Sequence, residues 1–447
     1  MVFNFKVKRS RSLNEIKAVL CLTTSYPCSR EDLAGHFVKR LNDQYPKTKW
    51  RVYVVCFQRG FQSVPRDELL KNEKSEASIF AVTPLGRSLS DGAPDRLSAS
   101  PLLTGVGLVV NSLKLYLRYR KVYRYLQMKY LDEPIVVAHW SIPCGWMARY
   151  KRPVIYCHGG DIALLESLPI GGLLRTWLAR SIFSRASRVI CVSEQLSQRL
   201  VRLIDQRDHH VEISTIPMGV CEPNPCDKYL KYIRNVIQEA RGSFGQELYG
   251  THHESLQEPL LVLSTVGRLV PIKGYDLLVE GIGLLPIKLR ERILWLMAGE
   301  GGELERLRSR AKALGVRLKV LGQLSPRERD ALLAETELFV APSRQIGSRV
   351  EGAPLALREA ALMGCSLMAT GLGGVSDLLA QLPKELAIEL EPSAISLHDH
   401  LKCYLENTRI KRDIKRAQHQ MIKRSRELWL WSSIGKTHTQ ILSESTH

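Results

Sequence analysis

The chain has 447 residues, which is too long for one compact core, so two domains are expected. A hydrophobic fraction of 45% is ordinary for a folded protein and argues against long disorder, and no run of ~18 apolar residues indicates a membrane-spanning helix. The formal net charge of +19 indicates an anionic partner: a nucleotide, a nucleic acid or an anionic membrane surface.

The N-terminus is basic but leads into no apolar core. The first cations are followed by Leu13-Asn14-Glu15-Ile16-Lys17, which is unlike a signal peptide, so a cytosolic location is expected. The 10 cysteines are scattered, and many lie in apolar segments, as small buried side chains do in a reducing compartment. The close pairs Cys21 with Cys28 and Cys221 with Cys226 lack histidine or cysteine neighbours at zinc spacing, so neither a metal nor a disulfide is expected.

Apolar segments that have the pattern of strands alternate with helical patterns along the whole chain. Many are near-continuous runs of Val, Ile and Leu, as expected for parallel strands that are covered on both faces. The alternation predicts two doubly wound α/β domains. The expected strands are 16–24, 50–57, 78–82, 135–139, 154–158, 188–193, 212–217, 260–267, 293–299, 317–322, 338–343, 366–370 and 387–390.

Helical patterns fill the intervals between these strands. Residues 325–328 open a helix with an N-cap serine, a proline at the first position and a capping glutamate. The domain boundary is expected after 216–220, and the polar segment 221–259 is interpreted as a linker plus an insertion that can be helical over 230–240. One long helix is expected over 409–431, with an apolar stripe formed by Ile410, Ile414, Ala417 and Met421.

Two glutamates, Glu351 and Glu359, stand eight positions apart after a short apolar strand, with a Gly-Ala-Pro turn after the first. Upstream, Gly267-Arg268 and Lys273-Gly274 frame a loop that carries two cations. Cations suit phosphates, and carboxylates suit hydroxyls. The two motifs together predict a site for a nucleotide diphosphate that carries a sugar.

The ordered motifs resemble those of the retaining glycosyltransferases of family 4, also described as glycosyl transferases group 1, which have the GT-B fold. Each motif is weak alone, but the ordered set, spread over most of the chain with family-like spacing, is a strong signal. The motifs that carry the resemblance are Ser25-Tyr26-Pro27, His158-Gly159-Gly160-Asp161, Val192-Ser193, Ile216-Pro217-Met218-Gly219-Val220, Gly267-Arg268 with Lys273-Gly274, Ala298-Gly299-Glu300-Gly301, Val320-Leu321-Gly322, Pro342-Ser343, Glu351-Gly352 with Glu359-Ala360, and Thr370-Gly371-Leu372-Gly373-Gly374.

The resemblance implies an α/β fold of two Rossmann-like, doubly wound parallel-sheet domains that face a central cleft. An N-terminal acceptor-side domain is then expected at 1–220 and the linker with its insertion at 221–259. The nucleotide-sugar-binding domain is expected at 260–415. A C-terminal helix at 416–447 is expected to cross back to the N-terminal domain.

The resemblance also implies roles for individual residues. Such enzymes stabilise the leaving diphosphate with fixed cations and use no metal-binding carboxylate motif, so no metal and no cofactor besides the donor are expected. Arg268 and Lys273 would carry that charge as catalytic and donor-binding residues. Glu351 would meet the donor sugar or the phosphate end, and Glu359 the ribose hydroxyls. The alternative is a surface turn and two helix-surface carboxylates. The remaining implied donor-binding residues are Gly267, Gly322, Gly352, Ala353, Pro354 and Leu355.

His158 ends a predicted strand and enters a glycine turn, and by resemblance it is catalytic and faces the reaction centre. The alternative is a satisfied core histidine, and Asp161 can instead cap the following segment. The sequence departs from the family pattern where Asp32-Leu33 stand in place of a common Gly-Gly, with Gly35 nearby. That departure bears on the N-terminal contribution to phosphate or acceptor binding. A second departure, Ser366-Leu367 for Pro-Val, bears on packing.

The segment 112–130 is rich in cations and tyrosines, and Leu115, Tyr119, Val122 and Leu126 fall on one helical stripe. A basic amphipathic helix of this kind suits an anionic membrane interface, which favours a lipid-linked acceptor at the inner leaflet. The alternative is an ordinary domain helix with a solvated basic face. A nucleic-acid partner is not expected, because the chain has no helix-turn-helix, zinc-finger or RNP signature.

We therefore predict a retaining glycosyltransferase of the hexosyltransferase type. It would move a sugar from a nucleotide-diphosphate sugar to a hydroxyl of a saccharide or lipid-linked acceptor, in cell-surface polysaccharide or glycolipid synthesis. Retention of configuration follows from the resemblance alone. The alternatives are a sugar-nucleotide epimerase or a phosphorylase of the same architecture, and a non-catalytic basic GT-B scaffold that binds membranes or partners. The sugar, the base and the acceptor are left open.

Overall fold

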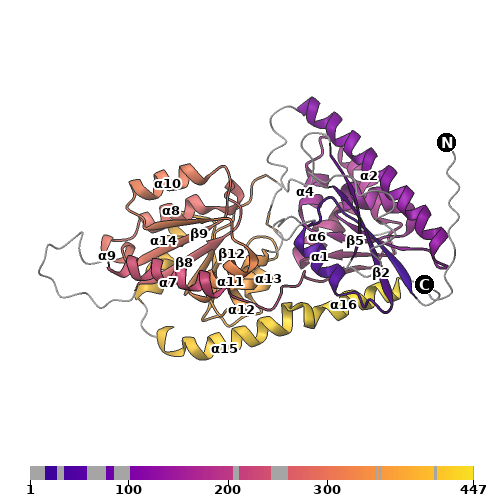
Figure 1. Cartoon of the computed structure of the whole chain (residues 1–447). Helices are drawn as coiled ribbons and strands as arrows, with labels where there is room; N and C mark the ends of the chain where they lie inside the picture. The colour runs from indigo at the N-terminus through magenta and orange to yellow at the C-terminus, as the bar shows by residue number, and fades with distance from the viewer. Residues whose placement is uncertain are drawn as a thin grey trace, which may run out of the picture. The chain divides into compact units, whose positions relative to one another are not determined.

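The chain divides into two compact units (Figure 1), of which unit 1 is Met1–Gly219 with Ile434–His447 and unit 2 is Val220–Ser433. Each unit is a parallel sheet with helices, so the predicted α/β class with two Rossmann-like domains is confirmed. The computed structural model describes residues 16–27, 35–57, 77–84, 101–204, 211–242, 260–347, 350–351, 354–406 and 410–445.

Unit 1 has, in its described part, a seven-stranded sheet in the order β3-β2-β1-β4-β5-β6-β7. All neighbouring strands pair in parallel. The strands β1, β2, β4, β5 and β6 are almost wholly buried, as the near-continuous apolar runs predicted. The strand bounds are β1 (Lys17–Leu22), β2 (Trp50–Phe57), β3 (Ser78–Val82), β4 (Ile135–His139), β5 (Val154–Cys157), β6 (Arg188–Cys191) and β7 (Ile213–Thr215).

The longest helix of unit 1, α2, packs on β2 and β3. Its predicted apolar stripe, Leu115, Tyr119, Val122 and Leu126, is buried. This stripe therefore belongs to the core, as the interpretation of an ordinary domain helix predicts, and it is not available to a membrane. The helices are α1 (His36–Asp43), α2 (Pro101–Lys129), α3 (Trp146–Ala148), α4 (Gly160–Ser167), α5 (Gly172–Phe183), α6 (Glu194–Ile204) and α16 (Trp431–Glu444), with the short turns η5 (Ser141–Gly145) and η6 (Arg149–Lys151). Within the described ranges, no helix is long and apolar enough to cross a membrane.

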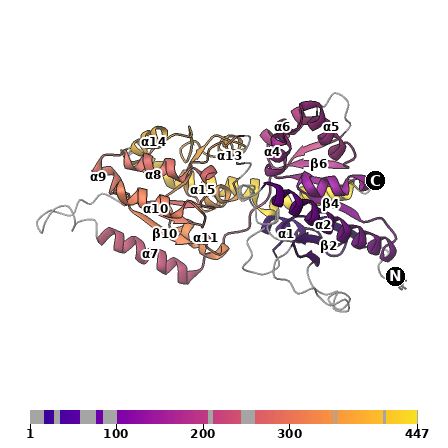
Figure 2. The same ribbon diagram turned by 90° about the horizontal axis from the view of Figure 1, so that it is seen from above.

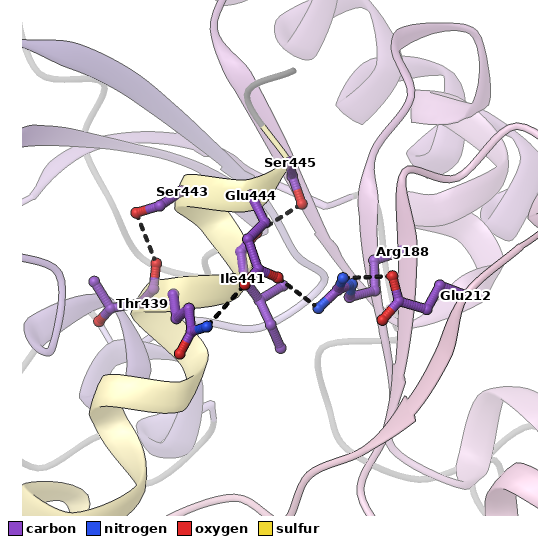
Figure 3. Close-up of polar contacts among 8 residues, drawn as sticks. Arg188, Glu212, Thr439, Ile441, Ser443, Glu444 and Ser445 are labelled. Atoms are coloured by element: carbon purple, nitrogen blue, oxygen red, sulfur yellow. Dashed lines mark hydrogen bonds and ion pairs between the residues drawn. The ribbon is translucent and has the colours of Figure 1, made fainter.

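Contacts in the middle and at the C-terminal end of α16 hold it on unit 1, which includes this helix from Ile434 onward. His438 Nδ1 and Tyr156 Oη share a hydrogen bond of 3.0 Å in the interior. Near the end of α16, Glu444 forms an ion pair of 3.1 Å with Arg188, which also pairs with Glu212 (Figure 3). The residues from 434 onward thus complete the first unit, although they come last in the sequence.

Unit 2 has, among its described residues, a six-stranded sheet in the order β10-β9-β8-β11-β12-β13, and all its neighbouring strands are parallel. The strands are β8 (Leu261–Val266), β9 (Ile293–Ala298), β10 (Leu318–Gly322), β11 (Leu338–Ala341), β12 (Ser366–Thr370) and β13 (Ala387–Leu390). Every strand predicted from the sequence of either unit is present, and several are shorter at one or both ends.

Helices cover both faces of this sheet (Figure 2). On one face, α8 (Tyr275–Gly283), α10 (Leu304–Ala313) and α14 (Ala394–Glu406) share a core with the fully buried Trp295. The short pieces η9 (Pro271–Lys273) and α9 (Ile287–Arg290) lie in the connections. The other face carries α7 (Asp227–Gly242), α11 (Pro326–Ala334), α12 (Leu355–Leu362), α13 (Val375–Leu379) and α15 (Ile410–Trp429).

The segment interpreted as a linker and insertion contains a structural layer of unit 2. α7 begins at Asp227, earlier than the expected 230, and its Ile233, Val236 and Ile237 are buried against β8 and β9. The amphipathic pattern of this helix was visible in the sequence, but the polar residues around it suggested an addition outside the core. Residues 243–259 lie outside the described part of the chain.

The expected single helix over 409–431 ends earlier, at Trp429. Val220 donates its amide to the Trp429 carbonyl at 2.8 Å, and the Trp431 amide donates to the Val220 carbonyl at 3.1 Å. These two hydrogen bonds form a β-bridge between Val220 and Leu430, and the helix is interrupted at Leu430, between α15 and α16. Ala417 and Met421 are buried in unit 2, so the predicted stripe packs there as far as the described side chains show.

Candidate functional site

The loop after β8 is in close backbone contact with the segment that follows β11. β8 and β11 are neighbours in the parallel sheet, so the segments that follow them leave from the same edge. Gly274 has φ 66°, and a Cβ at this position would lie 1.8 Å from the Pro342 carbonyl oxygen. Only glycine permits this approach without displacing the backbone. The predicted phosphate loop and the Pro-Ser strand end are therefore one structural site.

Lys273 and Glu351 meet at this edge. The Lys273 ammonium donates to one carboxylate oxygen of Glu351, and the Ser343 hydroxyl donates to the other. Burial by itself raises the pKa of Glu351, but Lys273, Ser343 and the nearby Arg268 guanidinium outweigh it and hold that pKa below its ordinary value. Glu351 is therefore ionised at neutral pH and engaged with a cation.

The backbone at Glu351 is supported by the loop after β12. Gly373 has φ 68°, and a Cβ there would lie 1.9 Å from the Glu351 carbonyl oxygen. The Thr370 hydroxyl donates to the Ser343 carbonyl oxygen. The predicted loop 370–374 thus packs against the backbone of Glu351 and Ser343. Gly352 and Ala353, predicted donor-binding residues, lie outside the described residues, while Pro354 and Leu355 begin α12.

Gly267, Arg268 and Lys273 lie close together on the loop. A Cβ on Gly267 would come within 2.8 Å of the Tyr275 hydroxyl and 3.2 Å of Lys273 Cε, so glycine here makes room for both side chains. The Arg268 side chain is exposed, and its charge acts on Glu351. Two cations thus lie near one carboxylate, and this excess of positive charge favours an anionic ligand.

Glycine turns after β9 and β10 complete this edge of the sheet. The Gly267 amide donates to the Ala298 carbonyl at 3.0 Å, and the Gly299 amide donates to the Gly322 carbonyl at 2.7 Å. A Cβ on Gly299 would lie 1.8 Å from the Gly267 carbonyl oxygen. Gly322, predicted to bind the donor, therefore stands on the same edge and supports the turn beside the phosphate loop.

Glu359 belongs to a second cluster. Its carboxylate forms an ion pair of 2.9 Å with Arg329 of α11, which also pairs with Asp330 at 3.0 Å. Burial raises the pKa of Glu359, Asp330 adds to the rise, and Arg329 opposes it. Asp330 in turn accepts the Asn224 amide at 2.9 Å. Glu359 is thus tied to α11 and, through it, to the segment before α7.

His158 belongs to unit 1, where it stands after β5. Its Nε2 shares a hydrogen bond of 3.0 Å with Nδ1 of His139, one nitrogen donating and the other accepting. The ring packs against Phe37 and Trp140, with centroids 4.8 and 5.1 Å away. Burial lowers the pKa of His158 to about 4, although Asp161 opposes the shift. The imidazole is therefore neutral at neutral pH.

Asp161 is a structural residue. One of its oxygens accepts the amides of His158 and Gly159 at 3.1 and 3.0 Å, and the other accepts the amide of Ser141 at 2.7 Å. The carboxylate is buried. From the first turn of α4 it thus holds the backbone just before the helix and joins it to the loop at Ser141.

Gly35 packs against the turn Ser25-Tyr26-Pro27 of unit 1. Gly35 has φ 72° and precedes α1, and a Cβ there would lie 2.4 Å from the Ser25 carbonyl oxygen. A glycine is therefore required against this turn, two residues after Asp32-Leu33. Residues 28–34 lie outside the described part of the chain.

Three site residues were missed by reasoning from sequence. His139 and His158 end two consecutive predicted strands, which pair in the sheet. Two histidines at the carboxyl ends of consecutive strands could have indicated a contact between them. Ser343 ends the predicted strand 338–343, and its hydroxyl could have been read as a partner for Glu351. Arg329 carried no signal, because its contact with Glu359 depends on how α11 and α12 pack.

Known proteins are similar to this chain in a family model and in fold. Residues 252–427 match the family model described as "Glycosyl transferases group 1". Sucrose-phosphate synthase from Thermosynechococcus elongatus has 15% identity and a TM-score of 0.68 over 96% of this chain and 98% of that one. Anabaena HepE, solved in complex with UDP, has 16% identity and a TM-score of 0.64 over 96% and 100%. WaaG, a glycosyltransferase involved in lipopolysaccharide biosynthesis, has 16% identity and a TM-score of 0.55 over 95% and 99%.

No curated protein sequence matches the chain. At these identities the solved structures establish the fold, and the predicted GT-B fold is confirmed. The family match spans every predicted donor-binding residue, from Gly267 to Glu359.

Proposed function

Because residues 252–427 match the glycosyl transferases group 1 family, we propose that this protein is a retaining glycosyltransferase. It moves a sugar from a nucleotide-diphosphate sugar to a hydroxyl of a saccharide or lipid-linked acceptor, in cell-surface polysaccharide or glycolipid synthesis. The observation that carries the proposal is the contact of Lys273 with Glu351, beside Arg268, at the carboxyl edge of the unit 2 sheet.

In this proposal, Arg268 and Lys273 bind the diphosphate and stabilise the charge that it gains as it leaves. Without donor, Lys273 is held by Glu351. With donor bound, the diphosphate takes over part of that charge, and Glu351 becomes free to accept hydrogen bonds from sugar hydroxyls. No metal is assigned, because the two fixed cations supply the positive charge that the leaving group needs.

The chemical step exchanges one bond for another at the anomeric carbon. The bond from this carbon to the diphosphate oxygen breaks, and its electron pair leaves with the diphosphate. The acceptor oxygen bonds to the same face of the sugar, which retains the configuration, and its proton passes to the departing phosphate oxygen. We assign to the neutral His158 a hydrogen bond to the sugar, and to Glu359 the ribose hydroxyls, as the resemblance implies.

A thermal-shift experiment tests donor binding. A ligand that binds only the folded protein stabilises it by about 2.7 kcal/mol at a hundred times its dissociation constant. Because HepE was solved with UDP, UDP is the first probe and GDP the second. We expect one of them to raise the melting temperature of the wild type and of Lys288→Ala, an exposed control, but not of Lys273→Ala. Equal shifts in all three proteins would refute the assigned site.

Product analysis tests the reaction class. With the matching sugar nucleotide, the wild type should release the free nucleoside diphosphate, and Glu351→Gln should release far less. An epimerase would change the sugar without releasing diphosphate, and a non-catalytic scaffold would bind the donor without consuming it.

A further inference from the structure

The first half of α5 in unit 1 presents large apolar side chains to solvent. Leu173 is 92% exposed and Trp177 is 63% exposed, and Leu174 between them is also exposed. The opposite side of the helix is buried through Ala179, Ile182 and Phe183. Leu173 and Trp177 are four residues apart, so they point the same way from the helix. The helix therefore has an inner apolar side that packs and an outer apolar side that nothing in the described structure covers.

Aromatic side chains on a neighbouring turn extend this exposed surface. α5 packs against η5 and η6. Around these turns, Trp146 and Tyr150 are exposed, and the Arg149 guanidinium lies 4.4 Å from the centroid of each ring. Arg185, which follows α5, lies 4.8 Å from the Tyr150 ring. We call Trp146, Tyr150, Leu173, Leu174 and Trp177 the α5 patch.

Cations outnumber acidic residues in the segment that carries the α5 patch. Residues 141–187 contain the cations Arg149, Lys151, Arg152, Arg175, Arg180 and Arg185 but only two acidic residues. Both acidic side chains have other partners: Asp161 is buried among backbone amides, and Glu166 pairs with Arg199. The acidic groups of this segment therefore do not offset the cations beside the patch.

The positive surface continues onto α2. The Lys151 ammonium lies 4.6 Å from the Tyr123 ring of α2. Residues 101–131 contain no acidic residue, and Arg120, Lys121 and Arg124 of this helix are exposed. The basic side of α2 and the α5 patch are thus joined through the turn at 149–151.

We propose that the α5 patch docks unit 1 on the surface of an anionic lipid bilayer. Leu173, Leu174 and Trp177 would enter the boundary between headgroups and acyl chains, where tryptophan and tyrosine are favoured. The arginines stacked on Trp146 and Tyr150 would reach the lipid phosphates. The charge argues against a second copy of this chain as the occupant, because a two-fold contact places the same patch on both sides and brings arginine against arginine.

This assignment differs from the membrane hypothesis that the sequence suggested. The stripe Leu115, Tyr119, Val122 and Leu126 is core, so the apolar contact moves to α5 and the adjacent turn. The cations of 112–130 keep a supporting role, since each basic residue near an anionic surface adds attraction of about 1 kcal/mol. The proposal does not depend on glycosyl transfer.

Vesicle sedimentation tests the proposal with the full-length protein. We expect the wild type to sediment with vesicles of phosphatidylcholine and phosphatidylglycerol, but not with phosphatidylcholine alone, and to be released by salt. The double variant Leu173→Ser with Trp177→Ser should lower the partition coefficient at least about tenfold, because each buried side chain of this size contributes that much or more. Both positions are exposed, so the melting temperature should not change.

A matched control and a charge variant sharpen the test. Ile395→Ser replaces an exposed apolar side chain of unit 2 and should bind vesicles as the wild type does. Arg149→Glu with Arg185→Glu should lose binding to the anionic vesicles. Wild type that stays in the supernatant, or a Leu173/Trp177 variant that still sediments fully, would overturn the proposal. A wild-type dimer in light scattering that the same variant converts to a monomer, without vesicle binding, would assign the patch to a second copy instead.

Discussion

Lys273 and Glu351, which are 78 residues apart in the sequence, form an ion pair in which 18% and 17% of the two side chains are exposed. Lys273 sits on the loop after β8, and Glu351 precedes α12. The pair shows that both predicted motifs reach the same edge of one sheet. It also holds the Lys273 ammonium group in place, so the diphosphate of the proposed donor would meet a positioned cation.

Removal of the Lys273 ammonium group should lower the free energy of unfolding. Lys273→Ala leaves the mostly buried Glu351 carboxylate with the Ser343 hydroxyl, and we expect the free energy of unfolding to fall by about 1–3 kcal/mol. Urea unfolding at pH 7 measures this change. The control is Arg308→Ala, which removes an exposed ion pair with Glu305 and should cost about 0.5 kcal/mol or less. Equal losses in the two variants would contradict the role of the pair.

His158 should make the protein sensitive to mild acid. Its pKa is about 4 in the folded protein because of burial, with Asp161 opposing, and about 6.5 in an unfolded chain. Below pH ~6.5 the unfolded state therefore binds a proton that the folded state does not, so stability is lost as the pH falls from ~6.5 towards 4.

The variant His158→Asn isolates this contribution. Between pH 7 and pH 5, the wild type should lose about 1–2 kcal/mol more unfolding free energy than the variant does. Denaturation at both pH values provides the measurement. Parallel losses in wild type and variant would show that folding does not lower the pKa of His158.

Gly274 should not tolerate a side chain. It has φ 66°, and a Cβ would lie 1.8 Å from the Pro342 carbonyl oxygen. Gly274→Ala should therefore lower the free energy of unfolding by more than about 1 kcal/mol and weaken nucleotide binding, because the loop that holds Lys273 must move. Gly302→Ala is the control, since a Cβ there meets nothing within 4 Å. A Gly274→Ala variant as stable as this control would contradict the packing.

Arg329 should affect binding of the nucleoside part through Glu359. Arg329→Ala removes the 2.9 Å ion pair, and the raised pKa of Glu359, which follows from burial and Asp330, should rise further. We expect weaker binding of UDP or GDP, whichever binds the wild type, by about tenfold, with inorganic diphosphate binding unchanged. Isothermal titration provides both values. Loss of diphosphate binding as well would place Arg329 with the phosphate site instead.

The strand pattern was predictable because parallel strands buried on both faces must be apolar throughout. Segments such as 50–57, 135–139 and 366–370 therefore stood out and have the same bounds in the structure. α7 was harder to interpret. Its apolar positions have helical spacing, but only the packing of Ile233 against β8 and β9 shows that the helix is part of unit 2.

The same contrast holds in the candidate site. The local chemistry of Lys273, Arg268 and the two glutamates could be interpreted from residue type and spacing. The partners of each could not: Glu359 pairs with Arg329, and His158 with His139. These contacts join elements that are adjacent only in the folded chain, and no short-range pattern encodes them.

The sequence by itself determined the order of strands and helices and the loops that carry charge and glycine, because these depend on local periodicity and on backbone freedom. Only the tertiary structure decided which faces are buried. It turned the stripe of 112–130 towards the sheet, left Leu173 and Trp177 of α5 in solvent, and buried Asp161 among backbone amides. Burial depends on what each side chain packs against, and that is settled by the whole fold.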